Sequence, residues 1–147
     1  MILEANKSRI DELTILGLLL WPDNDFEDLK DDFSQLMESE YNKVYLYFHE
    51  NSCVAFIHLS VRRDYVEGSN SSPVAYVEGI YVKPEYRRQG ISKQLITAGE
   101  QWGRALGCTQ IASDIEQSNT ESFDFHLGVG FKETNRLITF IKDIRAE

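Results

Sequence analysis

Apolar residues in the first third of this chain recur three or four positions apart, as they do along one face of a helix. Residues 10–20 keep this spacing until Trp21-Pro22 interrupts it, because the residue before a proline disfavours helical geometry. Residues 25–41 repeat the spacing and carry acids in the first turn, where the helix dipole favours negative charge. The pattern predicts two amphipathic helices.

The pattern then changes to alternating and β-branched residues, which are typical of strands. Residues 44–50 and 53–65 flank a short polar turn and predict a hairpin. Pro73 opens a third strand, and this strand ends at Val82, just before a second proline that cannot donate to a ladder.

The rest of the chain predicts two more helices and two more strands. They are a helix over 91–106, a strand over 108–114, a helix over 119–127 and a closing strand over 134–144. Because a helix connects them, the strand over 108–114 should run parallel to the one ending at Val82. The order indicates an α/β (α+β) fold, and the length of 147 residues suits a single domain over residues 1–147.

Composition and charge narrow the possible partners. The net charge of −9 disfavours nucleic acid and favours a cationic small molecule, although solubility alone would also explain it. The longest apolar run, 15–21, is too short for a membrane span, and no basic segment with a cleavage site opens the sequence, so we expect a cytoplasmic protein. Cys53 and Cys108 lie far apart in strand-like runs, which predicts reduced core residues and no bound metal.

Candidate chemistry lies between Val82 and the helix that follows. Residues 87–92 read Arg-Arg-Gln-Gly-Ile-Ser and join a strand to a helix N-terminus, which presents unpaired N–H groups and the positive end of a dipole. Gly90 lets an anion approach the backbone amides, and arginine pairs with phosphate at two points. The segment predicts a seat for a phosphate group.

This segment resembles the coenzyme A loop of the GCN5-related N-acetyltransferases, whose pattern is Gln or Arg, two residues, Gly, one residue, then Gly or Ala. Ser92 departs slightly from the pattern, while residues 128–131, Gly-Val-Gly-Phe, look like the closing Gly-Phe of the family. Five other segments resemble the bacterial aminoglycoside 6′-N-acetyltransferases more closely, namely residues 20–22, 63–68, 71–74, 77–82 and 112–114.

The resemblance implies a mixed, mostly antiparallel central sheet with a splayed parallel pair of strands and helices on both faces. It also implies transfer of the acetyl group from acetyl-CoA to the 6′-amine of an aminoglycoside by direct attack in a ternary complex, which confers antibiotic resistance. Similar enzymes are often homodimers that pair or exchange C-terminal strands, and residues 137–141 offer such an edge.

The resemblance also implies which residues hold the two substrates. The residues expected to bind acetyl-CoA are Ile80, Tyr81 and Val82 through their backbone, with Arg88, Gln89, Gly90, Ile91, Ser92, Lys93 and Asn119. The residues expected to bind a cationic aminosugar are Trp21, Asn24, Tyr65, Glu78, Asp114 and Asn135. Trp21 could equally be a core residue. Asn24 and Asn135 stand where that group carries a histidine and a glutamate, so each removes a titratable contact to the drug.

The acceptor amine is an ammonium ion at neutral pH, so carboxylates would attract it and relay its proton away. Glu78 and Asp114 are the candidate catalytic acids, with Asp114 assigned to the reacting amine and Glu78 to a second amine or to proton removal through water. Either could instead close its strand by pairing with an arginine or a loop N–H. His126 stands where many relatives carry a tyrosine that protonates the departing thiolate, and it could be that acid or a packed residue.

Two other functions remain open on the sequence. The same coenzyme site could serve acetylation of a polyamine or a peptide amine. The chain could also be a non-catalytic module that binds acetyl-CoA and associates with protein through its sheet edge.

Overall fold

The computed structural model describes residues 1–145. The chain divides into two compact units, Met1–Asp114 and Ile115–Glu147, which are taken in turn. The first contains the sheet and three α-helices, and the second contains the last helix and the C-terminal segment.

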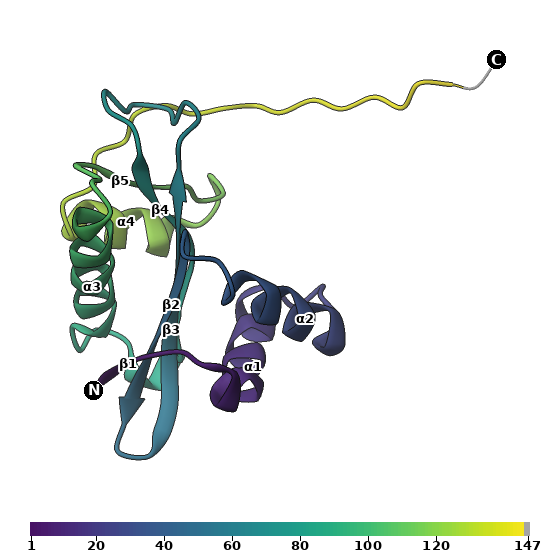
Figure 1. Ribbon diagram of the computed structural model, residues 1–147. Helices are drawn as coiled ribbons and strands as arrows, with labels where there is room; N and C mark the ends of the chain where they lie inside the picture. The colour runs from purple at the N-terminus through teal and green to yellow at the C-terminus, as the bar shows by residue number, and fades with distance from the viewer. Residues whose placement is uncertain (146–147) are drawn as a thin grey trace. The chain divides into compact units, whose positions relative to one another are not determined.

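A five-stranded sheet forms the centre of the first unit (Figure 1). The strands follow one another across it in chain order: β1 (Ile2–Glu4), β2 (Asn42–His49), β3 (Ser52–Arg62), β4 (Val74–Val82) and β5 (Ile111–Ser113). Every neighbouring pair is antiparallel except β4 and β5, which run parallel. The mixed sheet with one parallel pair confirms the predicted fold class.

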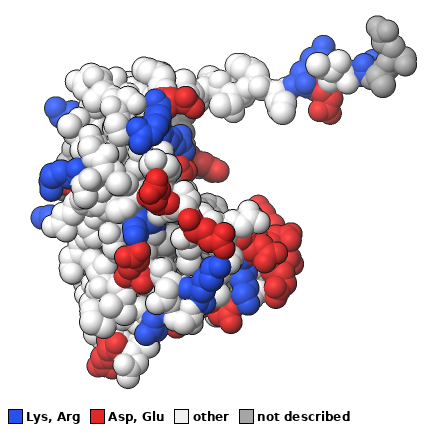
Figure 2. Space-filling view, in the orientation of Figure 1, with Lys and Arg blue, Asp and Glu red and all other residues white. Residues whose placement is uncertain are grey.

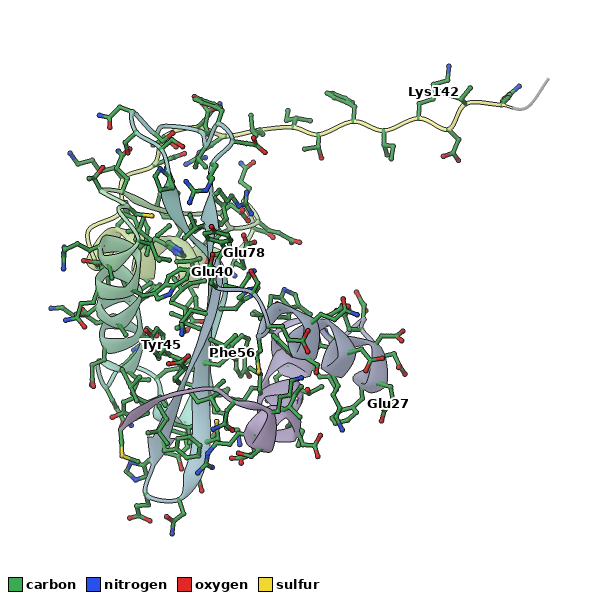
Figure 3. All side chains as sticks on the ribbon, in the orientation of Figure 1. Glu27, Glu40, Tyr45, Phe56, Glu78 and Lys142 are labelled. Atoms are coloured by element: carbon green, nitrogen blue, oxygen red, sulfur yellow. The ribbon has the colours of Figure 1, made fainter. Side chains whose placement is uncertain are left out.

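Helices cover both faces of this sheet, as Figure 1 shows. On one face lie α1 (Ile10–Leu20) and α2 (Phe26–Leu36), and between them and the sheet is an apolar cluster that includes Leu46 and Phe56. Figure 3 shows Phe56 in this layer, with Glu27 on the outer side of α2. On the other face α3 (Ile91–Ala105) approaches closely, since a Cβ on its Gly99 would lie 2.8 Å from a Leu59 methyl carbon on β3. Short 3₁₀ turns, η1 (Lys7–Arg9) and η2 (Pro84–Tyr86), precede α1 and follow β4.

Several predicted boundaries were too generous. The second helix ends at Leu36 instead of residue 41, because turns at 37–41 lead directly into β2. The strand predicted over 53–65 ends at Arg62, and the one over 108–114 contracts to the three residues that pair with β4.

The second unit contains α4 (Thr120–Gly128), which begins after the capping side chain of Asn119. The closing strand predicted over 134–144 is wrong, because residues 131–145 carry no regular secondary structure. A strand needs a partner for its N–H and C=O groups, and within the described chain this segment pairs with none. Its apolar side chains remain exposed, from 72% at Leu137 to 97% at Ile141.

Candidate active site

The predicted phosphate loop joins β4 to α3 through two residues with positive φ. Arg88 has φ 63° and Gly90 has φ 80°, and Gly90 occupies the N-cap position of α3 without a side-chain hydrogen bond to the first turn. Arg87 ties the loop to the end of β4, since its Nε donates to the carbonyl oxygen of Val82 at 2.8 Å. The exposed turn therefore places backbone N–H groups and the positive end of the α3 dipole at one point, as an anion requires.

A cavity of about 560 Å³ adjoins this turn on the α3 side of the sheet. Gly90 and Lys93 line it together with Tyr45, which Figure 3 shows between α3 and the sheet. The cavity lies on the face opposite α1 and α2, so it adjoins the phosphate end of the candidate site and not the carboxylates.

The two strands that flank the candidate coenzyme site separate soon after they pair. β5 is hydrogen-bonded to β4 only from Ala75 to Val77, where Val77 faces Ser113. Beyond this point Ile80, Tyr81 and Val82 pair with β3 on one edge, and in the described residues their other edge faces no strand. That open edge can accept an extended, amide-bearing ligand as an added strand.

Glu78 and Asp114 are the residues that directly follow the last pair, Val77 and Ser113. The β3–β4 register skips Glu78, which forms a β-bulge opposite His58 and Leu59. Figure 3 shows Glu78 on β4, above the α1 and α2 helices in this view. The point where β4 and β5 separate is therefore edged by two carboxylates.

Glu78 is paired with two side chains of β3. Its Oε1 accepts from Ser60 Oγ at 2.7 Å and from Arg62 Nε and Nη2 at 3.1 and 2.8 Å, while Oε2 accepts from Nη2 at 3.0 Å. The Glu78 side chain is 27% exposed and that of Arg62 is 43% exposed. The sequence left open whether Glu78 pairs with an arginine, and in the structure it pairs with Arg62.

Asp114 is held by a different kind of partner. The hydroxyl of Tyr76 donates to its Oδ2, and the guanidinium of Arg62 lies 3.4 Å from the centre of the Tyr76 ring. Burial, together with the hydrogen bond to Asp114, raises the pKa of Tyr76 to about 12, so this phenol stays protonated at physiological pH. Asp114, Tyr76, Arg62 and Glu78 therefore form one connected group.

Sequence reasoning missed three members of this group, Ser60, Arg62 and Tyr76. Ser60 and Arg62 alternate along β3 on the face that carries Phe56, and Tyr76 lies opposite Ser60 on β4. The alternation was visible in the sequence, but the partner of Glu78 depends on the register in which β3 pairs with β4.

Trp21 lies on the same face of the sheet, next to the carboxylate group. Its ring packs against Gly79 and lies 6.0 Å from the Phe56 ring and 6.4 Å from the Phe33 ring, centre to centre. This packing supports the interpretation of Trp21 as a core residue. Trp21 is only half-buried, however, and its ring adjoins Gly79, the residue after Glu78.

The other predicted acceptor residues of the first unit lie in loops. Asn24 donates through Nδ2 to the carbonyl of Trp21 at 3.2 Å, and it closes the turn after α1. Tyr65 is 76% exposed in the loop after β3. In the described residues, neither is a hydrogen-bond partner of Glu78 or Asp114.

The remaining predicted site residues belong to the second unit. Asn119 Oδ1 accepts from the N–H of Ser122 and caps α4. His126 Nδ1 lies 2.7 Å from the carbonyl oxygen of Ser122, and its ring contacts Phe125 and Phe131, so it has the contacts of a packed residue. Asn135 is exposed and accepts from the N–H of Arg136.

Residues 1–145 offer neither a metal site nor a membrane span. No group of three or more His, Cys, Asp or Glu side chains there could hold a metal ion. Within the same residues, every helix is too short or too polar to cross a bilayer.

Comparison with known proteins gives matches over nearly the whole chain. The model of the acetyltransferase (GNAT) family matches residues 10–131. An aminoglycoside N(6′)-acetyltransferase type 1 of Salmonella typhimurium is 35% identical over 141 residues, which cover 96% of this chain and 97% of that protein.

Two solved structures are similar in both sequence and fold. AAC(6′)-Iy, in complex with the bisubstrate analog CoA-S-monomethyl-acetylneamine, superposes with a TM-score of 0.93 at 34% identity, covering 98% of each chain. AAC(6′)-Ih from Acinetobacter baumannii, an aminoglycoside antibiotic 6′-N-acetyltransferase, gives 0.91 at 36% identity and the same coverage. Because the family model and these relatives match nearly the whole chain, the chain belongs to the GNAT acetyltransferase family.

Proposed function

We propose that this protein is an aminoglycoside 6′-N-acetyltransferase, which transfers the acetyl group from acetyl-CoA to the 6′-amine and so confers antibiotic resistance. The observation that carries the proposal is the position of Glu78 and Asp114, directly where β4 and β5 separate. This is the point at which a coenzyme on the open edge of β4 would meet a cationic acceptor. The 35% identity with enzymes of this activity supports the choice of acceptor.

The loop and the open strand edge bind the co-substrate in this proposal. The first-turn amides of α3, with the side chains and backbone of residues 88–93, hold its phosphates. The backbone of Ile80, Tyr81 and Val82 pairs with its amide-bearing arm, as does the side-chain amide of Asn119, whose oxygen already caps α4.

Acetyl transfer requires the acceptor ammonium to lose a proton before its nitrogen can attack. We assign this proton to Asp114, directly or through water, and a second ammonium of the aminosugar to Glu78. The N–C bond forms as the C–S bond breaks, and the departing thiolate takes up a proton. Burial raises the pKa of Cys53 to about 11, so this thiol is a poor nucleophile, which supports direct attack in a ternary complex.

His126 is the proposed source of the proton for the thiolate. With Nδ1 donating to the Ser122 carbonyl, the neutral ring carries a lone pair on Nε2, so it can donate there only as an imidazolium. This acid role predicts that His126→Gln lowers kcat while the KM for acetyl-CoA stays unchanged.

The proposed aminosugar site extends beyond the two acids. Trp21 forms a wall beside Gly79, and Asn24, Tyr65 and Asn135 add polar or aromatic contacts. The acidic side chains of α2, which gather at the lower right of Figure 2, and the net charge of −9 favour approach of a polycation.

We also propose a homodimer in the cytoplasm, where acetyl-CoA is available, with residues 1–147 acting as one domain. The family match over residues 10–131 spans both compact units, which supports a single domain.

The exposed, alternating segment 137–141 supports dimer formation, since a second copy could supply the strand partner that it needs. Sedimentation of the full chain and of a variant ending at residue 133 would test this.

The first experiment is thiol release from acetyl-CoA with an aminoglycoside that bears a 6′-amine, compared with its 6′-hydroxyl counterpart. Release with the amine alone is expected. Asp114→Asn should then lower kcat about 10²- to 10⁴-fold, the range for a lost general base, while Glu78→Gln should act mainly on KM. Saturable binding of acetyl-CoA without release for either drug would contradict the proposal and favour a polyamine or peptide acceptor or a non-catalytic module.

A further inference from the structure

Arg62 joins the two carboxylates of the candidate site. Its guanidinium donates to both oxygens of Glu78 and stacks on the ring of Tyr76, whose hydroxyl donates to Asp114. Arg62 lies on β3, Tyr76 and Glu78 lie on β4, and Asp114 directly follows β5. No other cationic side chain contacts Glu78 by ion pair within residues 1–145.

The contacts leave the two oxygens of Glu78 in different states. Oε1 accepts three bonds, from Ser60 Oγ and from Nε and Nη2 of Arg62, whereas Oε2 accepts one, from the same Nη2. Oε2 therefore has the greater remaining capacity to accept a proton donor from a ligand. A planar guanidinium held at two points and stacked on a ring fixes the orientation of the carboxylate, which a lysine could not do.

The role of this pair is not explained by stability alone. Both side chains are partly exposed, and ion pairs at such positions contribute little to folding. The net charge of the group also indicates a role in binding the acceptor. One guanidinium beside two carboxylates leaves a single net negative charge to attract the acceptor ammonium. Without the cation, two neighbouring carboxylates would repel each other.

We propose that Arg62 is a positioning residue for the acceptor amine, which orients Glu78 through Oε1 and, by stacking on Tyr76, keeps Asp114 aligned with it. Arg62 then acts through the two carboxylates and does not bind the coenzyme. This role rests on the proposed acetyltransferase function.

Arg62→Ala tests the role. We expect kcat/KM for the aminoglycoside to fall about 10- to 100-fold, the scale of a misplaced contact, with the KM for acetyl-CoA unchanged. Millimolar guanidinium chloride should restore part of the lost activity, because it refills the space between Glu78 and the Tyr76 ring, whereas sodium chloride and urea should not. Arg62→Lys should recover little, since an ammonium ion cannot donate in the same fork.

Two further variants separate positioning from folding. Tyr76→Phe keeps the ring under the guanidinium and removes only the donor to Asp114, so it should lower kcat without affecting the melting temperature. Arg63→Ala is the matched control, because Arg63 is the next residue, stacks on Tyr41 at 5.3 Å and touches neither acid. It should leave the kinetic constants unchanged.

The outcomes distinguish the two proposals. Wild-type protein that releases no thiol with any aminoglycoside would contradict the proposed function. If the wild type is active, two results would overturn the role of Arg62 alone. One is an Arg62→Ala variant with the same kcat/KM as the wild type. The other is a loss of activity that guanidinium does not restore and that accompanies a lower melting temperature.

Discussion

A substitution at Gly79 tests whether the Trp21 ring packs where the structure places it. A Cβ added to Gly79 would lie 2.5 Å from both Cη2 and Cζ2 of the Trp21 ring and 3.2 Å from a methyl carbon of Leu20. Carbon atoms pack at about 3.5–4.0 Å, so Gly79→Ala requires the ring to retreat by about 1 Å. The ring cannot retreat freely, because Phe33 and Phe56 pack around it.

The expected cost follows from this overlap. Overpacking a well-packed core by one methyl group typically destabilises a protein by about 1–3 kcal/mol. For a chain of this size, each kcal/mol lowers the melting temperature by roughly 2–4 °C. Urea unfolding monitored by tryptophan fluorescence would measure the loss. If Trp21 also forms a wall of the acceptor site, the KM for the aminoglycoside should rise in the same variant.

Two variants make the test specific. Trp21→Phe removes the two ring atoms that overlap, so Gly79→Ala should cost less in that background, with a coupling energy of about 1 kcal/mol or more. Gly128→Ala is the matched glycine control, since its Cβ would meet nothing within 4 Å. A Gly79→Ala variant as stable as the wild type, or an equal loss in both backgrounds, would refute the packing of Trp21 on β4.

Three other predictions concern separate parts of the chain. Gly90→Ala should weaken coenzyme A binding in calorimetry, because φ 80° costs a residue with a Cβ about 1 kcal/mol. Burial lowers the pKa of His58, so its neutral form stabilises the fold; this stability is present above about pH 6.5 and is lost as pH falls through the folded pKa. In urea unfolding between pH 7 and 5, His58→Gln should therefore lose less stability than the wild type. The double variant Cys53→Ala, Cys108→Ala should keep thiol release within about twofold, since a covalent cysteine step would abolish it.

Local sequence patterns predicted most of the fold. They failed where an element forms only if it pairs with a segment that is distant in the sequence. The first helix was predicted with its end before Trp21-Pro22, because its apolar spacing and this stop are both local. The closing strand over 134–144 was predicted from an equally clear alternation, yet alternation indicates only that a segment can pair. No strand in the described chain completes it, so the pattern alone could not decide whether a strand forms.

The candidate site was predictable to a similar extent. Motif resemblance identified Glu78 and Asp114, and the structure places both where β4 and β5 separate. Their partners could not be predicted, because they depend on the register in which β3 pairs with β4. The bulge at Glu78 also turns the following Gly79 toward Trp21, on the same face as Glu78. Sequence alternation without the bulge would place Glu78 and Gly79 on opposite faces.

The two carboxylates have different partners, and this difference supports dividing the chemistry between them. Arg62 offsets the charge of Glu78 with a cation and occupies most of its Oε1 capacity, so Glu78 is suited to recognition of a second donor on the aminosugar. Asp114 is held by a neutral phenol, and a neutral donor orients a carboxylate without cancelling its charge. Asp114 thus keeps the stronger attraction for an ammonium ion, and it lies directly after β5, where β4 and β5 separate. These partners support the proposed assignment of the reacting amine to Asp114.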